Sequence, residues 1–333
     1  MIPTAEHLAA FLGHLDARDA RAATDLAVDL ALRGASLPDL FARLIGPAQA
    51  EVGRRWSQDA YSVADEHAAT AIVDAVVAVL ATQVPPQASG GPRVALTCPE
   101  GEWHVLPARL TAEVLRWGGC PTTFLGGSLP AHHLARFLAA TPVDVVAVSC
   151  TTPLALPGVL ASVEVAHAAG LPVLAGGRAL GPDGRRARTL GADLWAPDAQ
   201  TALDLLAAPL PVELATSTAA VADAEAIAAA RDELVDRAVA VLEAGLADDA
   251  SYDDAQRART AEDLGYLVEV AAAALLVGDP TVFTDLVVWL DEVLVHRGVP
   301  AGTLERSLAL LEAADGPAAL AALLAEGRRR LVG

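Results

Sequence analysis

The sequence contains no lysine, so all 23 basic residues are arginines, and 42 acidic residues outnumber them. The formal net charge of −19 disfavours a general affinity for the phosphates of nucleic acids or for anionic membranes. No arginine-rich stripe offsets this charge, because the run at 328–330 is typical of a helix end, where cations suit the helix dipole. We therefore expect neither nucleic acid nor a membrane among the partners of this protein.

Cysteine and long apolar runs are also scarce. The three cysteines, Cys98, Cys120 and Cys150, have neither the spacing of a disulfide framework nor that of a metal knuckle. All three fall in or beside predicted strands, so we expect buried free thiols in a reducing compartment. No apolar run approaches the roughly 20 residues that span a bilayer, and Glu6 and His7 interrupt any N-terminal signal sequence. We expect a soluble, cytoplasmic protein.

Aromatic residues make up only 4% of the chain while hydrophobic residues make up 53%, so its apolar content is mostly alanine, leucine and valine. This composition favours helices and a packed α/β core, and it argues against disorder. Two proline-containing breaks, at about 85–92 and 209–220, divide the chain into blocks of residues 1–84, 93–208 and 221–333.

Hydrophobic periodicity predicts a different structure for the middle block than for the other two. For 1–84 we expect a four-helix bundle, with helices at about 4–13, 16–33, 37–55 and 62–82. For 93–208 we expect a Rossmann-like parallel sheet covered by helices, with strands at 93–97, 121–125, 143–149, 172–175 and 193–195 and helices at about 105–118, 130–140, 156–169, 181–190 and 200–207. For 221–333 we expect an all-helical domain, with helices at about 222–248, 254–277, 279–297 and 301–314 and another at the C-terminus.

A histidine follows the first predicted strand of the middle block. The chain there reads CPEGEWH over 98–104, and a helix opens around Pro107. Ligands of parallel sheets bind at the carboxyl ends of strands, and imidazole is a strong nitrogen ligand for cobalt or iron. Glu102 is placed to accept a hydrogen bond from the other imidazole nitrogen of His104. An isolated histidine in such a loop more often faces solvent, so the residues around it decide between the two interpretations.

Small and hydroxyl residues end the neighbouring strands. Ser149-Cys150-Thr151-Thr152 ends the third predicted strand, Gly176-Gly177 the fourth, and Gly126-Gly127 follows the second. The absence of side chains at the glycines allows close backbone approach. Together with the histidine loop, these strand ends predict a slot for a bulky planar ligand with a long tail.

The middle block resembles cobalamin-binding Rossmann domains, whose pattern is acidic-x-His-x-x-Gly, then Ser-x-Thr, then Gly-Gly. The resemblance implies that His104 becomes the lower cobalt ligand, displacing the nucleotide base of the cofactor. It also implies that the tail lies in a cleft lined by Ser149, Thr151, Gly176 and Gly177. Pro107 stands where the family has glycine. Proline is tolerated in the first turn of a helix, and its ring is expected to change the packing of the cofactor tail beside the histidine.

A second group of residues lies in the first block. Trp56 is predicted at a helix end, a loop follows, and Ser62 with Asp65 predicts the N-cap of the next helix. Glu66 and His67 then fall in the first turn of that helix and converge with Trp56 at one end of the bundle. Without other context, a core tryptophan and a solvated helix start would be the more frequent interpretation.

This spacing, Trp-x9-Glu-His upstream of a cobalamin domain, resembles the CarH-type light-sensing proteins, over about residues 1–208. The resemblance implies bound adenosylcobalamin, with Trp56 packed against the adenosyl group, Val63 lining its pocket and Glu66 hydrogen-bonding it. It implies that His67 moves to cobalt once light has cleaved the cobalt–carbon bond. CarH-type regulators carry a DNA-binding domain before the bundle, whereas this sequence starts at the bundle, so we do not expect operator binding.

The C-terminal block has two interpretations. One is a helical dimerisation or partner-docking module with an aromatic core. The other is a resemblance to the truncated bilin-binding domain of photocobilins, which implies a biliverdin chromophore near this block. Propionates and pyrrole N–H groups suit polar and aromatic partners, and the residues implied are Tyr266, Trp289, His296 and Arg297. Trp289 and His296 lie seven apart, on one face of a helix, and the block contains no cysteine for a thioether link.

Two enzymatic functions share part of this pattern. A corrinoid methyl-carrier protein of a methyltransferase system would also use His104 under a helical cap, but it needs no adenosine pocket and gives 221–333 no role. An adenosylcobalamin mutase subunit needs a barrel domain of roughly 250 residues, which the sequence lacks. We expect a photoreceptor rather than an enzyme, with an output through self-association as a homo-oligomer or through a partner protein that the sequence does not identify.

Overall fold

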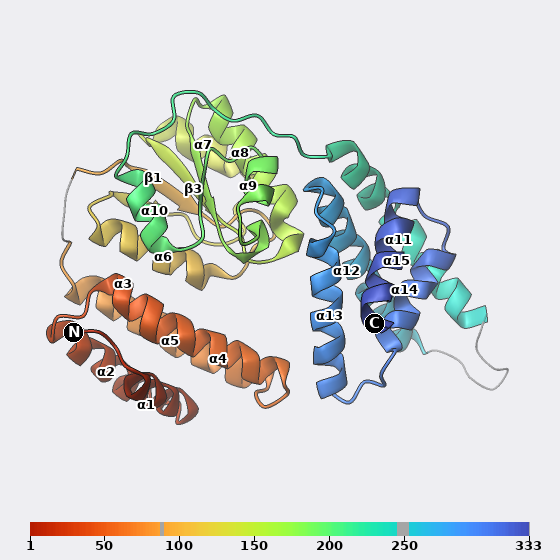
Figure 1. The fold of residues 1–333 in the computed structure, drawn as a ribbon, viewed down its shortest axis with the longest axis horizontal. Coiled ribbons are helices and arrows are strands. Elements are labelled where there is room, and N and C mark those ends of the chain that lie inside the picture. The colour runs from red at the N-terminus through yellow and green to blue at the C-terminus, as the bar shows by residue number, and fades with distance from the viewer. Residues whose placement is uncertain (87–89, 245–252, 333) are drawn as a thin grey trace.

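The computed structural model describes residues 1–86, 90–244 and 253–332, and its elements follow the three predicted blocks (Figure 1). A helical bundle lies beneath a layered α/β domain, and a second group of helices lies beside the α/β domain. The predicted fold class is therefore confirmed. Part of the first predicted linker, 87–89, and the end of the helix predicted at 222–248 lie outside the described residues.

The N-terminal bundle consists of α1 (Ala5–Asp16), α2 (Ala20–Leu32), α3 (Leu37–Leu40), α4 (Gly46–Ser57) and α5 (Val63–Gln83). The single helix predicted over 37–55 is interrupted by a π-helical turn at Phe41–Ile45, where the N–H of Gly46 donates to the carbonyl of Phe41. Pro47 has no N–H to donate back into the preceding turn, which favours such a local rearrangement. Ser62 and Asp65 form the predicted cap of α5.

The middle domain is a five-stranded parallel sheet in the order β2-β1-β3-β4-β5. The order reverses direction between β1 and β3, so the loops after these two strands flank the crevice in which parallel sheets bind ligands. The strands are β1 (Val94–Thr97), β2 (Thr122–Phe124), β3 (Val145–Ser149), β4 (Val173–Gly176) and β5 (Leu194–Ala196). The helices are α6 (Val105–Trp117), α7 (Ala131–Ala140), α8 (Leu156–Ala168), α9 (Arg185–Thr189) and α10 (Ala199–Leu206), with 3-10 turns at Pro153–Ala155 and Arg178–Leu180.

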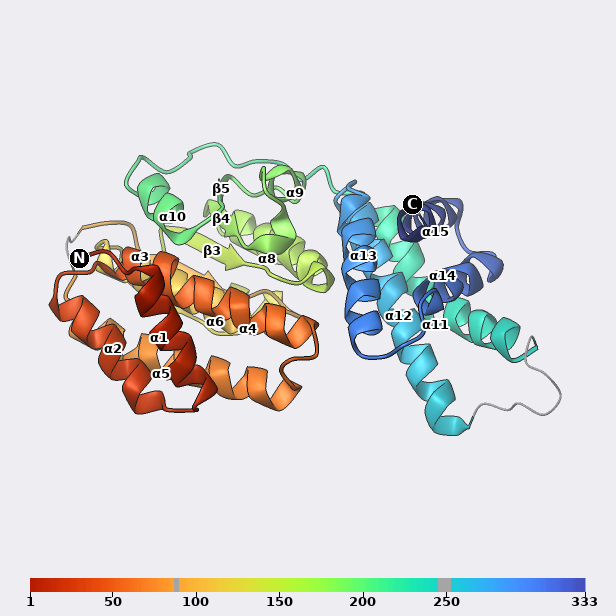
Figure 2. The same cartoon turned by 60° about the horizontal axis from the view of Figure 1, so that its bottom comes forward.

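Side chains alternate between the two faces of this sheet, as strand geometry requires. Val146 and Val148 of β3 pack with α7 and α8, whereas Val145 and Ala147 pack with α6 and α10. Helix α6 also touches the bundle, because Val114 on its other side belongs to the bundle core. Arg109 of α6 pairs with Asp74 of α5 at 2.7 Å. The bundle is therefore seated on α6, which lies between it and the sheet (Figure 2).

The C-terminal domain contains α11 (Val221–Ala244), α12 (Asp254–Leu276), α13 (Thr281–His296), α14 (Thr303–Ala313) and α15 (Ala318–Val332). Its core is continuous with that of the α/β domain, since buried residues of both form one hydrophobic cluster. Helix α12 contacts α8 and the turn at Pro153–Ala155. Arg186 of α9 adds a mostly buried ion pair with Asp279 at 2.8 Å and a hydrogen bond to Thr281 at 2.9 Å. The C-terminal domain is thus fixed to the α/β domain beside the ends of its strands.

Within the described ranges, no helix is both long and apolar enough to cross a bilayer. The predicted arginine run ends α15, where Arg328 pairs with Glu305 at 2.6 Å and also with Glu312. These arginines are occupied by neighbouring carboxylates, which agrees with the prediction of an ordinary helix end.

Candidate functional site

The loop after β1 holds Glu102 and His104 together at the crevice. The Glu102 side chain is fully buried, and its Oε1 lies 2.7 Å from Nδ1 of His104 and accepts a hydrogen bond from the His104 backbone N–H. Its Oε2 accepts from the backbone N–H groups of Thr151 at 2.5 Å and Thr152 at 2.8 Å. Glu102 therefore ties the loop after β1 to the loop after β3, and the predicted Glu102–His104 pair is confirmed as a contact.

These contacts determine the protonation of the pair. Burial favours the neutral carboxyl of Glu102, but the hydrogen bonds from His104, Thr152 and Thr151 outweigh it, and the net pKa of Glu102 is lowered. The hydrogen bond to Glu102 raises the pKa of His104 against the opposing effect of burial. Because the ionised carboxylate can only accept, Nδ1 of His104 carries the proton. In the neutral imidazole, the lone pair is then on Nε2, the tautomer that metal ligation through Nε2 requires.

The imidazole of His104 is accessible. Its side chain is 63% exposed, and Nε2 has no hydrogen-bond partner among the described residues. Arg178, which follows Gly177, lies close enough that its charge lowers the pKa of His104, and Glu66 of the bundle lies close enough to raise it. That Glu66 and His104 face one ligand from the two domains stays a prediction of the sequence.

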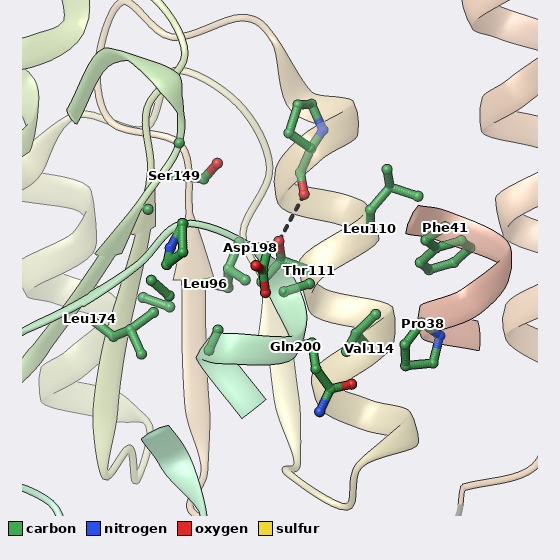
Figure 3. A pocket seen from close by; sticks show the side chains of 18 of the residues that line it. Pro38, Phe41, Leu96, Leu110, Thr111, Val114, Ser149, Leu174, Asp198 and Gln200 are labelled. Carbon is green, nitrogen blue, oxygen red and sulfur yellow. Dashed lines mark hydrogen bonds between the residues drawn. The ribbon is translucent and has the colours of Figure 1, made fainter. Parts of the chain in front are cut away.

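A cleft of about 430 Å³ opens between the sheet and helices α6 and α10 (Figure 3), and neither Glu102 nor His104 is among its lining residues. Its walls are mostly apolar, and Ser149 supplies a hydroxyl at the end of β3. Three of the predicted slot residues, Ser149, Gly176 and Gly177, line it, whereas Thr151 is not among the lining residues and acts through its backbone N–H on Glu102. Pro107, the departure from the family pattern, stands in the cleft wall, where its carbonyl accepts from Thr111 at 3.0 Å. The remaining lining residues include Pro38, Phe41, Leu96, Leu110, Val114, Leu174, Asp198 and Gln200.

The sequence did not reveal that the bundle supplies part of this cleft. Pro38 and Phe41 project toward it from α3 and the π-helical turn, opposite α6 (Figure 3). The π-helical turn was itself not predicted, and such turns are frequent at functional sites. Trp103 was also missed. It lies next to His104 with 74% of its surface exposed, and an exposed tryptophan beside a candidate ligand suits a site that a large apolar group covers.

The predicted residues of the bundle gather at one end of it. Trp56 lies in the last turn of α4, and Val63, Glu66 and His67 lie in the first turn of α5. Val63 is 53% exposed, although it is apolar. Glu66 accepts a hydrogen bond from Thr70 at 2.8 Å and its other oxygen lies 3.5 Å from Nε2 of the exposed His67.

A polar network fixes the loop between α4 and α5. Arg55 pairs with Asp16 at 2.7 Å, and the hydroxyl of Tyr61 also bonds to Asp16. Arg18 pairs with Asp65, the capping residue of α5, at 2.5 Å. Because these contacts hold both helix ends, Trp56 and the first turn of α5 keep a defined relative position.

Of the four C-terminal residues expected to contact a bilin, Trp289, His296 and Arg297 lie on or directly after α13, and Tyr266 lies on α12. Tyr266 is half-buried in α12, where burial raises the pKa of its hydroxyl. Trp289 and His296 lie on α13 as predicted, and Nδ1 of His296 lies 2.7 Å from the carbonyl of Glu292. Trp289 and Arg297 both contact Trp56 of the bundle. The structure thus joins two of these residues to Trp56, a contact that the sequence did not predict.

The three cysteines are buried and free, as predicted. Burial raises the pKa of Cys98 to about 12 and raises that of Cys150 well above its usual range. Thiolate, not thiol, is the nucleophile, so we expect Cys98 and Cys150 to resist iodoacetamide in the native protein and to react after unfolding in urea. Mass spectrometry of peptides after timed alkylation measures this; rapid native labelling of Cys98 would contradict it.

Two comparisons with known proteins extend this description. Residues 4–81 match a family described as a B12 binding domain, and residues 92–206 match a second family with the same description. No curated protein matches the sequence. The fold resembles the monomethylamine corrinoid protein of Methanosarcina barkeri, with a TM-score of 0.54 and 14% identity over 60% of this chain and 96% of that one.

Two further solved structures are similar at lower scores. One is a novel cobalamin-binding protein from Desulfitobacterium hafniense DCB-2, with a TM-score of 0.33 and 19% identity over 60% of this chain and 96% of that one. The other is the methanol:cobalamin methyltransferase complex MtaBC of Methanosarcina barkeri, with a TM-score of 0.33 and 14% identity over 63% of this chain and 83% of that one. At the identity of the corrinoid protein, the likeness shows the fold alone.

Proposed function

We propose that this chain, a cobalamin-binding protein with B12 binding domains at 4–81 and 92–206, is a light sensor that holds adenosylcobalamin between its bundle and its α/β domain. The observation that carries the proposal is the pairing of two half-sites. His104, held by Glu102, follows β1 of the α/β domain, and Trp56, Val63 and Glu66 lie together at one end of the bundle; we propose that the two groups would face the cofactor from opposite sides.

The residues of the site fit a corrinoid. His104 presents an unpaired Nε2, which is a suitable lower ligand for cobalt. The mostly apolar cleft suits the aromatic base of a nucleotide tail, and the Ser149 hydroxyl suits a nitrogen on that base. The exposed indole of Trp103 beside His104 suits a large flat ring. We assign the lower half of the site to these residues.

The adenosyl form is proposed from the bundle. When bound, adenosylcobalamin supplies a cobalt–carbon bond that visible light cleaves. The residues of this chain that would sense that event are Trp56, which would pack against the adenosyl group, Val63, which would line its pocket, and Glu66, which would hydrogen-bond it. His67, whose exposed imidazole is not buried in the bundle, is free to approach the upper face after the ligand has left. The bundle then moves relative to the α/β domain, and this two-state interface produces the signal.

A corrinoid methyl carrier is the second candidate function, and the likeness to the monomethylamine corrinoid protein favours it at the level of the fold. That likeness covers 60% of this chain, whereas this chain adds a C-terminal domain whose core is continuous with that of the α/β domain. A methyl carrier would need no wall of Trp56 and Val63 for an adenosyl group. The two candidate functions, light sensor and methyl carrier, therefore differ in whether the protein prefers cobalamin with an adenosyl or a methyl upper ligand.

The test is illumination of the full chain loaded with adenosylcobalamin in the dark. Green light is expected to change the absorption spectrum irreversibly while the cobalamin stays bound to the protein. A matched sample kept in the dark is expected to keep its spectrum. A protein that retains methylcobalamin but not adenosylcobalamin, and transfers the methyl group to a thiol acceptor, would support the methyl carrier and exclude the sensor.

We extend the proposal to the signal that the protein produces after illumination and to the role of its C-terminal domain. Size-exclusion chromatography before and after illumination is expected to show a change in self-association or in the apparent size of the protein. Biliverdin added to the cobalamin-loaded protein is expected to give a red-absorbing band that co-elutes with it, since the photocobilin resemblance implies a bilin near α12 and α13. No co-eluting band would remove the bilin and leave the cobalamin sensor in place.

A further inference from the structure

The C-terminal ends of two distant helices meet at Trp56. The guanidinium carbon of Arg297, directly after α13, lies 4.3 Å from the centroid of the Trp56 ring. Trp289 of α13 stacks on Trp56 with a centroid distance of 6.1 Å and an interplanar angle of 25°. Nη2 of Arg297 also donates to the backbone carbonyl of Trp56 at 3.4 Å. The α13 end therefore holds both the ring and the backbone of one residue.

These contacts are favourable on general physical grounds. A guanidinium over an indole face is attracted by the ring quadrupole, and tryptophan is the best aromatic partner for it. The cation also lies at the C-terminus of α4, where it faces the negative end of the helix dipole. Trp289 keeps 40% of its surface exposed, so it is not an element of the core. The contact fixes the position of Trp56 without being needed for the packing of the C-terminal domain.

The contact also connects the two halves of the cobalamin site. The C-terminal domain is fixed to the α/β half through the shared core and through Arg186, which bonds Asp279 and Thr281. It contacts the turn at Pro153–Ala155, immediately after Thr151 and Thr152, whose N–H groups hold Glu102. Trp56, in contrast, belongs to the bundle. Arg297 and Trp289 therefore set the position of an upper-half residue from a domain that is fixed to the lower half.

We infer that Arg297 and Trp289 are positioning residues of the cobalamin site, which hold Trp56 at the separation from His104 that accommodates a large adenosyl upper ligand. The inference rests on the proposed placement of Trp56 beside that ligand. Its consequence is selectivity: the C-terminal domain stabilises binding of the adenosyl form and has little effect on forms with a small upper ligand, such as hydroxocobalamin.

The test uses the full chain with Arg297→Ala and Trp289→Ala, and with Arg237→Ala as the matched control. Arg237 is an arginine of α11 that pairs with Glu233 of the same helix at 2.9 Å, far from the site in sequence. Dissociation constants for adenosylcobalamin and hydroxocobalamin are measured in the dark. Each test variant is expected to weaken adenosylcobalamin about tenfold, which is about 1.4 kcal/mol, and to leave hydroxocobalamin within about twofold; Arg237→Ala changes neither.

A conservative variant and a cofactor-free measurement separate positioning from general damage. Arg297→Lys keeps the charge but loses the planar stacking surface, so it is expected to restore only part of the adenosylcobalamin affinity. Without cofactor, the near-ultraviolet circular dichroism of the Trp56–Trp289 stack is expected to be lost in Trp289→Ala and reduced in Arg297→Ala, with an unchanged melting temperature. Equal weakening of both cobalamins, or tighter adenosylcobalamin binding in Arg297→Ala, would overturn the inference.

Illuminating the same samples keeps this inference distinguishable from the proposed function. Suppose that Arg297→Ala loses its preference for adenosylcobalamin over hydroxocobalamin in the dark and that the wild-type protein does not respond to light. This result would support the positioning role and reject the sensor. A light-sensitive wild-type protein whose selectivity does not depend on Arg297 or Trp289 would support the sensor and reject the positioning role.

Discussion

His104→Ala is expected to abolish tight cobalamin binding. In the proposed function the imidazole would be the lower ligand of cobalt through Nε2, because Nδ1 is engaged by Glu102. Replacing an outer partner of a metal ligand costs roughly 10–100-fold in affinity, so loss of the ligand itself is expected to cost about 100-fold or more. Equilibrium dialysis with hydroxocobalamin, which avoids light and the upper ligand, measures the change. Any cofactor that remains is expected to show the spectrum of a form without histidine ligation.

His132→Ala is the matched control, because His132 is an exposed histidine of the same domain, on α7. It is expected to bind cobalamin as the parent protein does. The His104 side chain is largely exposed, so its removal is expected to leave the melting temperature of the cofactor-free protein within a few degrees. A His104→Ala protein that keeps a histidine-ligated spectrum would show that another residue ligates cobalt from below.

Local sequence patterns predicted the elements of this fold because their causes are local. Residues 145–148 are an uninterrupted apolar run because a central parallel strand is buried on both faces. Ser62 predicted the start of α5 because its side chain satisfies the N–H of Asp65. The Glu102–His104 pair was predictable for a similar reason, since the two residues lie in one short loop after a strand.

The features that escaped prediction depend on residues far apart in the chain. Phe41 reaches the cleft because the bundle is seated on α6, and no local period of the sequence encodes that docking. Arg297 contacts Trp56 across 241 residues of sequence separation. The sequence suggested a bilin contact for Arg297 and an adenosyl contact for Trp56. Only the packing of the domains brings the two residues together.

Gly177 has a structural role in addition to the expected one. The sequence predicted a glycine whose missing side chain leaves room for a ligand, and Gly177 does line the cleft. Its backbone has φ of 106° and ψ of 158°, a region in which essentially only glycine is found. A Cβ at this position would lie 2.8 Å from both the backbone nitrogen and the carbonyl carbon of Cys150, and closer still to its carbonyl oxygen. The turn after β4 therefore needs glycine in order to pack on the end of β3.

Gly177→Ala is accordingly expected to be strongly destabilising even without cofactor. The backbone conformation alone costs about 1–3 kcal/mol for a residue with a side chain, and the clash with Cys150 is with backbone that cannot rotate away. We expect a total loss of about 4 kcal/mol or more, which is at the upper end for single substitutions. Urea unfolding followed by circular dichroism measures this loss, and a protein that accumulates only as insoluble material would agree with it.

Gly126→Ala provides the matched comparison, because Gly126 also has a positive φ, of 89°, but nothing lies within 4 Å of a Cβ built there. It carries the conformational cost of a left-handed residue, about 1–2 kcal/mol, without the clash. The difference between the two variants isolates the contact between the β4 turn and Cys150. Equal losses of unfolding free energy in the two variants would mean that the structure relaxes to relieve the clash with Cys150. Gly177 would then be needed to leave room in the cleft and not for the packing of the turn.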